Sequence, residues 1–420
     1  MTISYKKWQA ECSRIKNEVL SKFEKDLQSS GFILERGDAS CDREPLIEID
    51  GIIKDQKKHK LAFIRTQPKV DMRDTHIVEA ARIDVEQELV RYDVLTDGSL
   101  FYLLDANKRE TSYKESSYEE IIDELREREA QDDGNLICEY IENEFELCCS
   151  EDDLRFGGDM CSLRPEKERE LINESLKLQE SSSMVYRYVP LETAFKIIET
   201  GKIRMLGIAG MNDSSEVNYV WNFLYKQCKS SDRGINKTFI TSCSVKDEDL
   251  TQWRLYADDA KGARLGFKIK RMKDAIARKF VMRNVKYCDL DNDAGIKKLK
   301  GIIDFAYRNT GSVFEFKTFH EWGHFIKPKV YENEEEIRLL FQMTEEEKDP
   351  HGNWLIARGS SIVTPYVEFD LDEKFPLELK DIKLGPKCSE PEVNRFQLEE
   401  LAKSLKRGVD VKVSEIKNYR

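Results

Sequence analysis

The amino-acid sequence predicts an α+β protein, in which a small amino-terminal α/β region precedes a larger region built on a split antiparallel sheet. The first observation is length, because 420 residues exceed the roughly 100 to 200 residues of most domains. The second is the order of predicted elements, because helical patterns alternate with hairpins at the start, whereas many short strands follow residue 184. The third is an acidic stretch between them, broken by Gly, Asp and Ser. We therefore expect two folded domains and a connector.

The composition is typical of a globular chain, with 40% hydrophobic and 35% charged residues. The amino terminus lacks the apolar segment of a signal peptide, and no run of about 18 apolar residues is long enough to span a bilayer. We expect a cytoplasmic protein with no membrane partner.

Charge and cysteine content limit the classes of partner. The net charge is −12, so the molecule as a whole repels nucleic acid at long range, although a local basic patch could still bind it. The 10 cysteines are scattered, and the adjacent pair Cys148 and Cys149 has no C-x-x-C partner of zinc-ribbon type. We expect reduced, mostly buried thiols and no metal site.

The amino-terminal elements follow from apolar spacing. Residues 3–30 carry apolar side chains at helical intervals and end at Gly31. Two short strands are predicted within residues 46–67, joined by the polar turn DQKKHK. A helix is predicted at 75–92, and a second hairpin at 93–107, where DG forms the turn.

This order of helix, hairpin, helix and hairpin resembles the amino-terminal nuclease domain of type I restriction subunits, a member of the PD-(D/E)xK superfamily. In that family an Asp and an E-x-K motif hold a divalent metal that activates water. Asp50 matches the Asp, but Arg65 and Gln67 stand where Glu and Lys are expected. Because arginine cannot ligate magnesium, the resemblance implies that residues 1–115 form an inactive nuclease-like domain. An ordinary small α/β interaction domain is the alternative.

Residues 116–183 are expected to form a helical acidic connector. Acidic helical segments alternate there with Gly, Asp and Ser breaks, which suits an arm that runs over solvent. We place the domain boundary between about residues 150 and 183.

The carboxy-terminal region, residues 184–420, begins with a strand at 184–190 and an amphipathic helix that Gly201 ends. Later elements alternate in the same way, which favours an antiparallel, split sheet. Further strands are predicted at 203–210, 237–245, 281–290, 334–342, 364–371, 379–386 and 409–416, and a helix that turns into a strand at 249–269.

This region is identified as a member of a bacterial family of unknown function by a series of short motifs in a shared order. The motifs are Tyr186-Arg187-Tyr188, Asn212-Asp213 with Glu216, Ser242-Cys243-Ser244, Trp253 with Tyr256-Ala257, Gly262, Glu336 with Arg338, Thr364-Pro365-Tyr366, Leu384-Gly385-Pro386 and Tyr419-Arg420. Members of that family are commonly met in defence or mobile-element neighbourhoods. The resemblance therefore suggests a toxin or an anti-phage defence effector.

Three of these features also resemble the arginine-serine-glutamate class of ADP-ribosyltransferases, in which an arginine, an S-x-S strand and an E-x-E pair follow in that order. The matching residues are Arg187, Ser242 with Ser244, and Glu334 with Glu336. The resemblance implies NAD as the substrate and Glu336 as the catalytic carboxylate beside the ribose, where it stabilises an oxocarbenium-like sugar. It further implies that Glu334 orients the acceptor and that the serines position the nicotinamide ribose.

Other residues complete the expected NAD site. Arg187 offers paired donors that match pyrophosphate oxygens. Tyr186, Tyr188 and Tyr256 can stack on nicotinamide or adenine, and Asn212 lies in a Gly-rich loop that can close over the cofactor. Each feature also has a structural interpretation, because a strand arginine often forms an ion pair, acidic runs are usually solvated, and Asn and Asp build ordinary turns.

Two alternatives stay open. HEWGH, residues 320–324, matches the H-E-x-x-H pattern of zinc-dependent hydrolases, in which two histidines four apart share a helical face. Gly323 and Pro328 interrupt that helix. The other alternative is a non-catalytic sensor or adaptor. If the protein is a transferase, the sequence does not decide whether the acceptor of ADP-ribose is protein, DNA, RNA or water. A regulatory or phage-derived partner is a further alternative.

Overall fold

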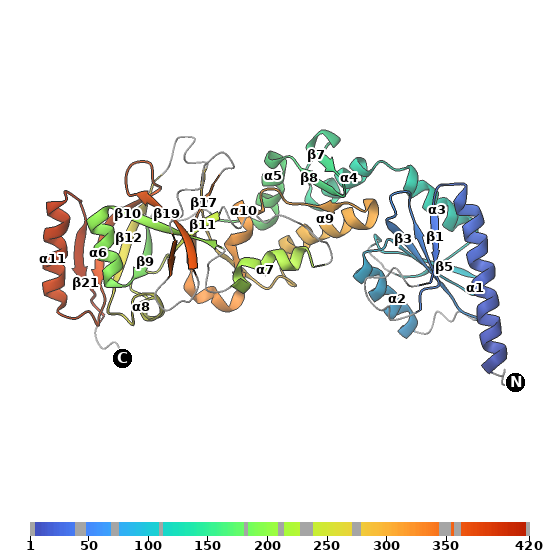
Figure 1. Cartoon of the computed structure of the whole chain (residues 1–420), viewed down its shortest axis with the longest axis horizontal. Helices are drawn as coiled ribbons and strands as arrows, with labels where there is room; N and C mark the ends of the chain where they lie inside the picture. The colour runs from blue at the N-terminus through green and yellow to red at the C-terminus, as the bar shows by residue number, and fades with distance from the viewer. Residues whose placement is uncertain are drawn as a thin grey trace. The chain divides into compact units, whose positions relative to one another are not determined.

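The computed structural model describes residues 5–37, 48–68, 75–108, 112–179, 184–208, 214–226, 238–270, 279–343, 354–356 and 363–416. It is a mixed α+β protein, as predicted (Figure 1). Contacts divide the chain into two compact units. The first comprises residues 1–171, 224–230 and 297–317, and the second comprises 172–223, 231–296 and 318–420. Since residues 297–317 join the first unit, the units do not follow a single cut in the chain.

The first unit contains a mixed sheet with the strand order β1-β2-β3-β4-β5-β6. Its only parallel neighbours among the described strands are β3 and β4, which α2 connects. The elements are α1 (Tyr5–Gln28), β1 (Ile33–Arg36), β2 (Gly51–Lys54), β3 (Lys60–Thr66), α2 (Thr75–Glu88), β4 (Tyr92–Thr96), β5 (Phe101–Asp105) and β6 (Lys114–Ser116). The two predicted helices and two predicted hairpins of this region are therefore confirmed.

Period-two alternation along β3 fills both faces of this sheet. Ala62 and Ile64 pack in the cluster that contains Phe23 of α1, whereas Phe63 packs with Val85 on the α2 side. Helices thus cover both faces, which explains why β3 and β4 are almost wholly buried.

The segment predicted as an acidic connector is folded. Its elements are α3 (Tyr118–Ala130), α4 (Asp133–Phe145), a short 3-10 turn η1 (Glu151–Asp153), β7 (Leu154–Gly157), β8 (Met160–Leu163) and α5 (Pro165–Leu176). Ser117 and Glu120 form a capping box on α3, and Asp132 caps α4. The later elements α9 (Ala294–Thr310) and β15 (Val313–Phe314) return to this region, where β15 pairs with β8.

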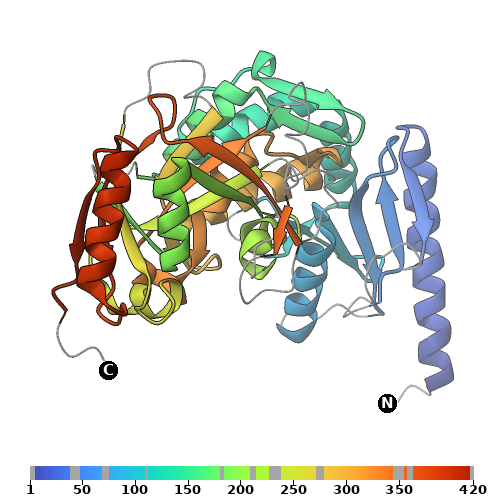
Figure 2. The same ribbon diagram turned by 60° about the vertical axis from the view of Figure 1, so that its left-hand side comes forward.

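The second unit is built on a curled, half-barrel sheet, shown from two sides in Figures 1 and 2, whose described strands are antiparallel except for the parallel pair β20–β21. Its strand order is β18-β19-β10-β11-β9-β12-β20-β21, and β17 pairs with β11 and β13. The strands are β9 (Met184–Val189), β10 (Lys202–Gly207), β11 (Thr238–Ser244), β12 (Ala263–Ile269), β13 (Phe280–Asn284), β17 (Glu336–Gln342), β18 (Trp354–Ile356), β19 (Val363–Asp370), β20 (Leu377–Leu384) and β21 (Asp410–Val413). Every strand predicted from the sequence of this region is present.

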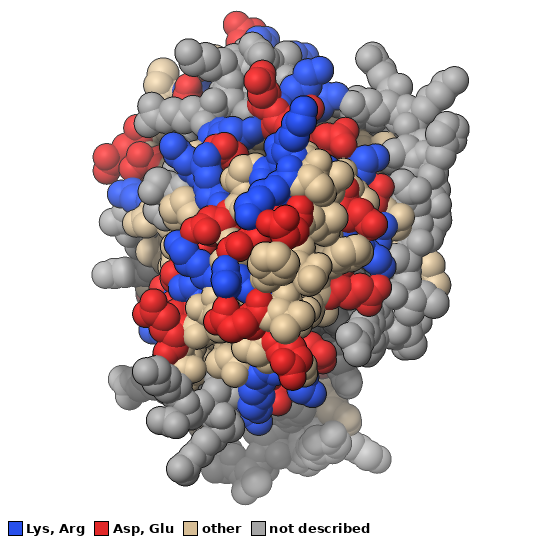
Figure 3. Space-filling model, turned by 90° about the vertical axis from the view of Figure 1, so that its left-hand side faces the viewer, with Lys and Arg blue, Asp and Glu red and all other residues tan. Residues whose placement is uncertain are grey.

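Helices α6 (Leu191–Thr200) and α11 (Pro391–Ser404) contribute Ile198 and Ala402 to the main core of the sheet. Gly201 ends α6 in the left-handed conformation, as predicted. The face that α6 and α11 present in Figure 3 mixes basic and acidic side chains around uncharged ones. The smaller elements are α7 (Ser214–Leu224), α8 (Leu250–Tyr256), β14 (Lys286–Cys288), α10 (Phe319–Trp322), the 3-10 turn η5 (Gly323–Phe325), β16 (Ile326–Pro328) and the 3-10 turn η6 (Lys329–Glu334). Within the described part of the chain, no helix is long and apolar enough to cross a membrane.

Candidate functional site

Three neighbouring strands of the second unit bring most of the predicted site residues together. Strand β11 lies between β9 and β17, and Ser244 is directly opposite both Tyr186 on β9 and Glu336 on β17. Ser242 is opposite Arg338 in the same ladder. Directly opposite residues of antiparallel strands point to the same face. The serine strand and the glutamate strand therefore present their polar side chains on one face of the sheet.

Glu336 is the centre of a buried ion-pair cluster. Arg338 contacts its carboxylate with two nitrogens, Nε at 2.8 Å from Oε1 and Nη2 at 3.1 Å from Oε2. Lys327 Nζ lies 3.3 Å from Oε2. Burial raises the pKa of Glu336, but Arg338, Lys327 and a hydrogen bond from Ser242 outweigh it, so the pKa lies below its usual value of 4.5. Glu336 is thus an ionised carboxylate held by two cations.

Lys327 links the two glutamates of the E-x-E pair. It lies on β16, and its Nζ is 2.7 Å from Glu334 Oε2. Glu335, between them, adopts a left-handed conformation with φ of 41°. It joins the 3-10 turn η6, which carries Glu334, to β17, which begins at Glu336, and both carboxylates contact the same ammonium group.

Glu334 differs from Glu336 in its access to solvent. It is half-buried, and its Oε1 accepts a hydrogen bond of 3.1 Å from the hydroxyl of Tyr256, whose side chain is exposed. Its backbone carbonyl accepts from Ser244 Oγ at 2.9 Å and from Gln252 Nε2 at 3.3 Å. The predicted serine strand therefore fixes the turn that carries Glu334, while its side chain keeps 16% exposure beside an aromatic ring, against 9% for Glu336.

Arg187 does not join this cluster. It lies next to Tyr186 along β9 and opposite Leu265 of β12, so its side chain points to the other face, where Val185, Leu265 and Cys243 form part of the main core. Glu336 and Arg187 therefore lie on opposite faces of the sheet, because adjacent strand residues alternate between faces. Arg187 is half-buried, has no hydrogen-bond or ion-pair partner among the described residues, and burial lowers its pKa.

The predicted stacking residues occupy different environments. Tyr188 is buried with its ring 5.0 Å from that of Trp253, and its hydroxyl donates to the Lys246 carbonyl at 2.9 Å. It is therefore a packing residue. Tyr186 is half-buried beneath the Arg264 guanidinium, 4.7 Å from the ring centroid. Asn212 lies outside the described residues.

The HEWGH segment does not form the helix that a zinc hydrolase requires. Helix α10 contains 4 residues, and the 3-10 turn η5 follows it directly, so His320 and His324 do not share one helical face. His324 is buried, and burial lowers its pKa to about 3, which keeps the imidazole neutral. Within the described part of the chain, no three His, Cys, Asp or Glu side chains are grouped to hold a metal ion.

The nuclease-like positions of the first unit are also occupied by internal contacts. Arg65 is buried between Asp93, at 2.8 Å, and Asp84, at 3.2 Å. Asp50 accepts hydrogen bonds from the Thr66 amide and hydroxyl at 2.6 and 2.7 Å, and pairs with Lys16 at 2.6 Å. Arg65 therefore holds a buried charge triad where the resemblance would place a metal ligand.

Lys327 is a site residue that sequence reasoning missed. The available signal was a lysine directly after the apolar pair Phe325 and Ile326 and before Pro328, which is a pattern of a buried strand carrying one cation. A buried lysine requires a carboxylate partner, and the acidic run ENEEE follows within the same segment.

In the comparison with known proteins, residues 252–339 match the model of one family, which is described as "Protein of unknown function (DUF2971)". No curated protein and no solved structure matches the chain. The matched segment runs from α8 to β17 and contains Tyr256, Lys327, Glu334, Glu336 and Arg338. The matched family segment thus includes the whole ion-pair cluster.

Proposed function

We propose that the second unit consumes NAD as an ADP-ribosyltransferase or NAD glycohydrolase, with Glu334 as the carboxylate that meets the ribose. The observation that carries this proposal is the Lys327-bridged pair of glutamates, in which one carboxylate is enclosed and the other lies beside the exposed ring of Tyr256. The proposal departs from the E-x-E resemblance, which implied that Glu336 is catalytic and that Glu334 orients the acceptor.

The chemistry favours the accessible carboxylate. Loss of nicotinamide creates positive charge on the ribose, and a carboxylate beside that carbon stabilises it. Both oxygens of Glu336 already contact cations, and the side chain is buried. Glu334 has one oxygen on Lys327 and one on the Tyr256 hydroxyl, so a ribose hydroxyl can replace the tyrosine contact without unpairing the lysine.

Glu336 then acts as a positioning residue. It neutralises Arg338 and shares Lys327 with Glu334, so it holds the ammonium group in place. Tyr256 offers an exposed aromatic face for nicotinamide or adenine. Arg187 is not assigned to this site, because it lies on the opposite face of the sheet.

The first unit, under this proposal, recognises a macromolecular acceptor or regulates the enzyme. Its support is an order of elements that resembles that of restriction nuclease domains, together with Arg65 and its paired aspartates where that resemblance would place a metal ligand. A role as a toxin or anti-phage effector rests only on the motif resemblance to a family met in defence neighbourhoods.

The experiment compares nicotinamide release from NAD by the wild type, Glu334→Gln, Glu336→Gln and Glu335→Gln, with thermal unfolding of each. Glu335 is the matched control, because it is the same residue type between the two and is exposed, with Lys246 as its partner. We expect Glu334→Gln to lose release by at least about 100-fold at matched folded concentration, and Glu335→Gln to behave as the wild type. Equal loss in Glu334→Gln and Glu335→Gln, or no release by the wild type with labelled cell extract as acceptor, would overturn the proposal.

A further inference from the structure

Two buried cysteines of the first unit lie in near contact. Cys138 is on α4, and Cys149 lies in the segment that leads into η1. Their sulfur atoms are 3.1 Å apart. A disulfide bond is about 2.05 Å long, so the sulfurs need to approach by only about 1 Å.

The backbone around this pair is already held in place. The amide of Cys149 donates to Glu142 Oε1 at 3.1 Å, one turn beyond Cys138 on the same helix. The next residue, Ser150, precedes η1, and its hydroxyl donates to Asp153 of that turn at 2.8 Å. The two thiols therefore face each other across an ordered junction between α4 and η1.

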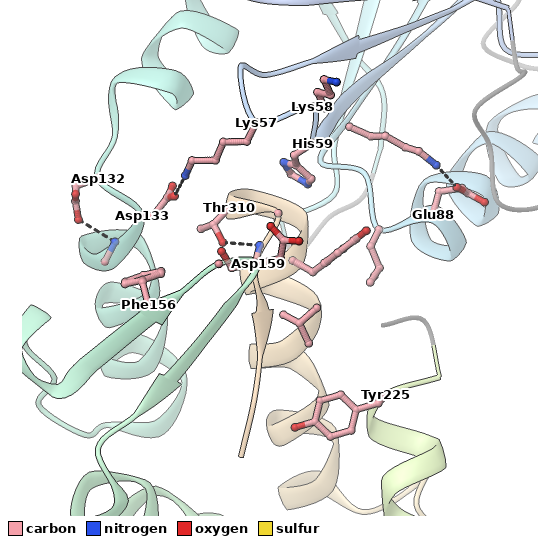
Figure 4. Close-up of a pocket in the computed structure, with 18 of the residues that line it drawn as sticks. Lys57, Lys58, His59, Glu88, Asp132, Asp133, Phe156, Asp159, Tyr225 and Thr310 are labelled. Atoms are coloured by element: carbon pink, nitrogen blue, oxygen red, sulfur yellow. Dashed lines mark hydrogen bonds and ion pairs between the residues drawn. The ribbon is translucent and has the colours of Figure 1, made fainter. Parts of the chain in front are cut away.

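The junction forms part of the wall of a cavity in the first unit. The cavity has a volume of about 1160 Å³ and is lined by Gly134 of α4, Glu151 of η1 and Phe156 of β7, among others. A Cβ built on Gly134 would lie 3.4 Å from Glu151 Cγ, so α4 and η1 touch at this wall. Figure 4 shows Asp132, Asp133 and Phe156 on this side of the cavity and the hairpin residue Lys57 reaching Asp133, at 2.6 Å.

We propose that Cys138 and Cys149 form a reversible disulfide that fixes α4 to η1 and so rigidifies this wall of the cavity. The bond would close a loop between a helix and the segment that follows it, which restricts the separation of the two wall elements. The proposal is independent of the chemistry proposed for the second unit.

The bond forms by a balanced reaction with a peroxide. One thiol is oxidised by hydrogen peroxide to a sulfenic acid with release of water, and the second thiol displaces a second water to form the S–S bond. A soluble thiol reductant reverses the reaction by exchange. Burial raises the pKa of both thiols, and the thiolate is the reactive form, so the oxidation is slow and proceeds faster at alkaline pH.

The direct test treats the full-length wild-type protein with hydrogen peroxide and maps cross-linked peptides by mass spectrometry, before and after addition of a thiol reductant. We expect a reducible Cys138–Cys149 cross-link. Labelling of the exposed Cys148 with a sulfenic-acid probe reports that the oxidant acted. Probe-labelled Cys148 without the cross-link, or a Cys148–Cys149 bond in its place, would overturn the proposal.

Variants separate the pair from the other thiols. We expect Cys149→Ser to abolish the cross-link, whereas Cys148→Ser and Cys161→Ser should retain it. Cys161 serves as the buried control, because it lies on β8 in the same unit. Amide hydrogen exchange then tests the structural effect, and we expect slower exchange in the first turns of α4 after oxidation. If the cross-link forms and this exchange stays unchanged, the rigidified wall is contradicted.

Discussion

The two units each bury a cluster of charges, and the clusters differ in one respect. In the first unit, the side chains of Arg65, Asp84 and Asp93 are at most 4% exposed. In the second unit, the side chain of Glu336 is 9% exposed, whereas that of Glu334 is 16% exposed and contacts the exposed Tyr256. A buried charge that is fully paired stabilises one arrangement of the chain, whereas a paired charge with an open side can also meet a ligand. The comparison teaches that the open carboxylate marks the better candidate site.

The largest predicted loss of stability follows from a change in the fully buried cluster of Arg65, Asp84 and Asp93. Arg65→Leu leaves Asp84 and Asp93 buried without their cation, so we expect it to lower the free energy of unfolding by about 3 to 5 kcal/mol. Denaturant unfolding of the first unit measures this. Arg14→Leu is the control, because Arg14 pairs with Glu18 at an exposed helical position, and its effect should remain below about 0.5 kcal/mol. A loss for Arg65→Leu no greater than for the control would contradict the triad's role.

The next effect tests the enclosed glutamate of the second unit. Glu336→Gln removes the negative charge shared by Arg338 and Lys327, and we expect a loss of about 3 kcal/mol at neutral pH. Because the pKa of Glu336 in the folded protein lies below 4.5, its contribution is present above that pH and is lost as the pH falls through the folded pKa. The stability difference between the wild type and the variant should therefore shrink below pH 4.5, as followed by unfolding at stepwise lower pH. A difference that does not change with pH would contradict an ionised Glu336.

A smaller effect, of opposite sign, is predicted for Arg187. Its side chain is half-buried on the core face without a partner among the described residues. Arg187→Met removes the cost of a desolvated charge and keeps an apolar stem, so we expect stability to rise by up to about 1 kcal/mol. Thermal and denaturant unfolding test this. A clear destabilisation would show that the charge of Arg187 is compensated in the folded state.

Much of the fold could be predicted because its elements have strong local signals. Period-two runs such as 237–245 became β11, and Gly201 ended α6 where its left-handed conformation was required. Residues 116–183 were predicted to be a helical connector, and helices α3, α4 and α5 form there, but charge density did not indicate the buried residues of α4 or the pairing of β7 with β8. The return of α9 and β15 to the first unit could not be predicted in this way. It depends on the pairing of β15 with β8, which is far away in the sequence, and no local pattern specifies that pairing.

The site was predicted in part for the same physical reason. Register brought Ser242, Ser244 and Glu336 together, but the motif YRY could not show which of its side chains faces them. A shift of one residue along a strand reverses its face, so Tyr186 lies on the glutamate side and Arg187 on the core side. The contacts of Lys327 with both glutamates could not be predicted, because they depend on the position of β16 beside the two side chains.

The most direct test of the central claim is nicotinamide release by Glu334→Gln measured against Glu335→Gln at matched folded concentration. The two variants change neighbouring glutamates in the same way, and only Glu334 contacts both Lys327 and Tyr256. We predict that Glu334→Gln loses release by at least about 100-fold while Glu335→Gln retains it. Full release by Glu334→Gln would contradict the account.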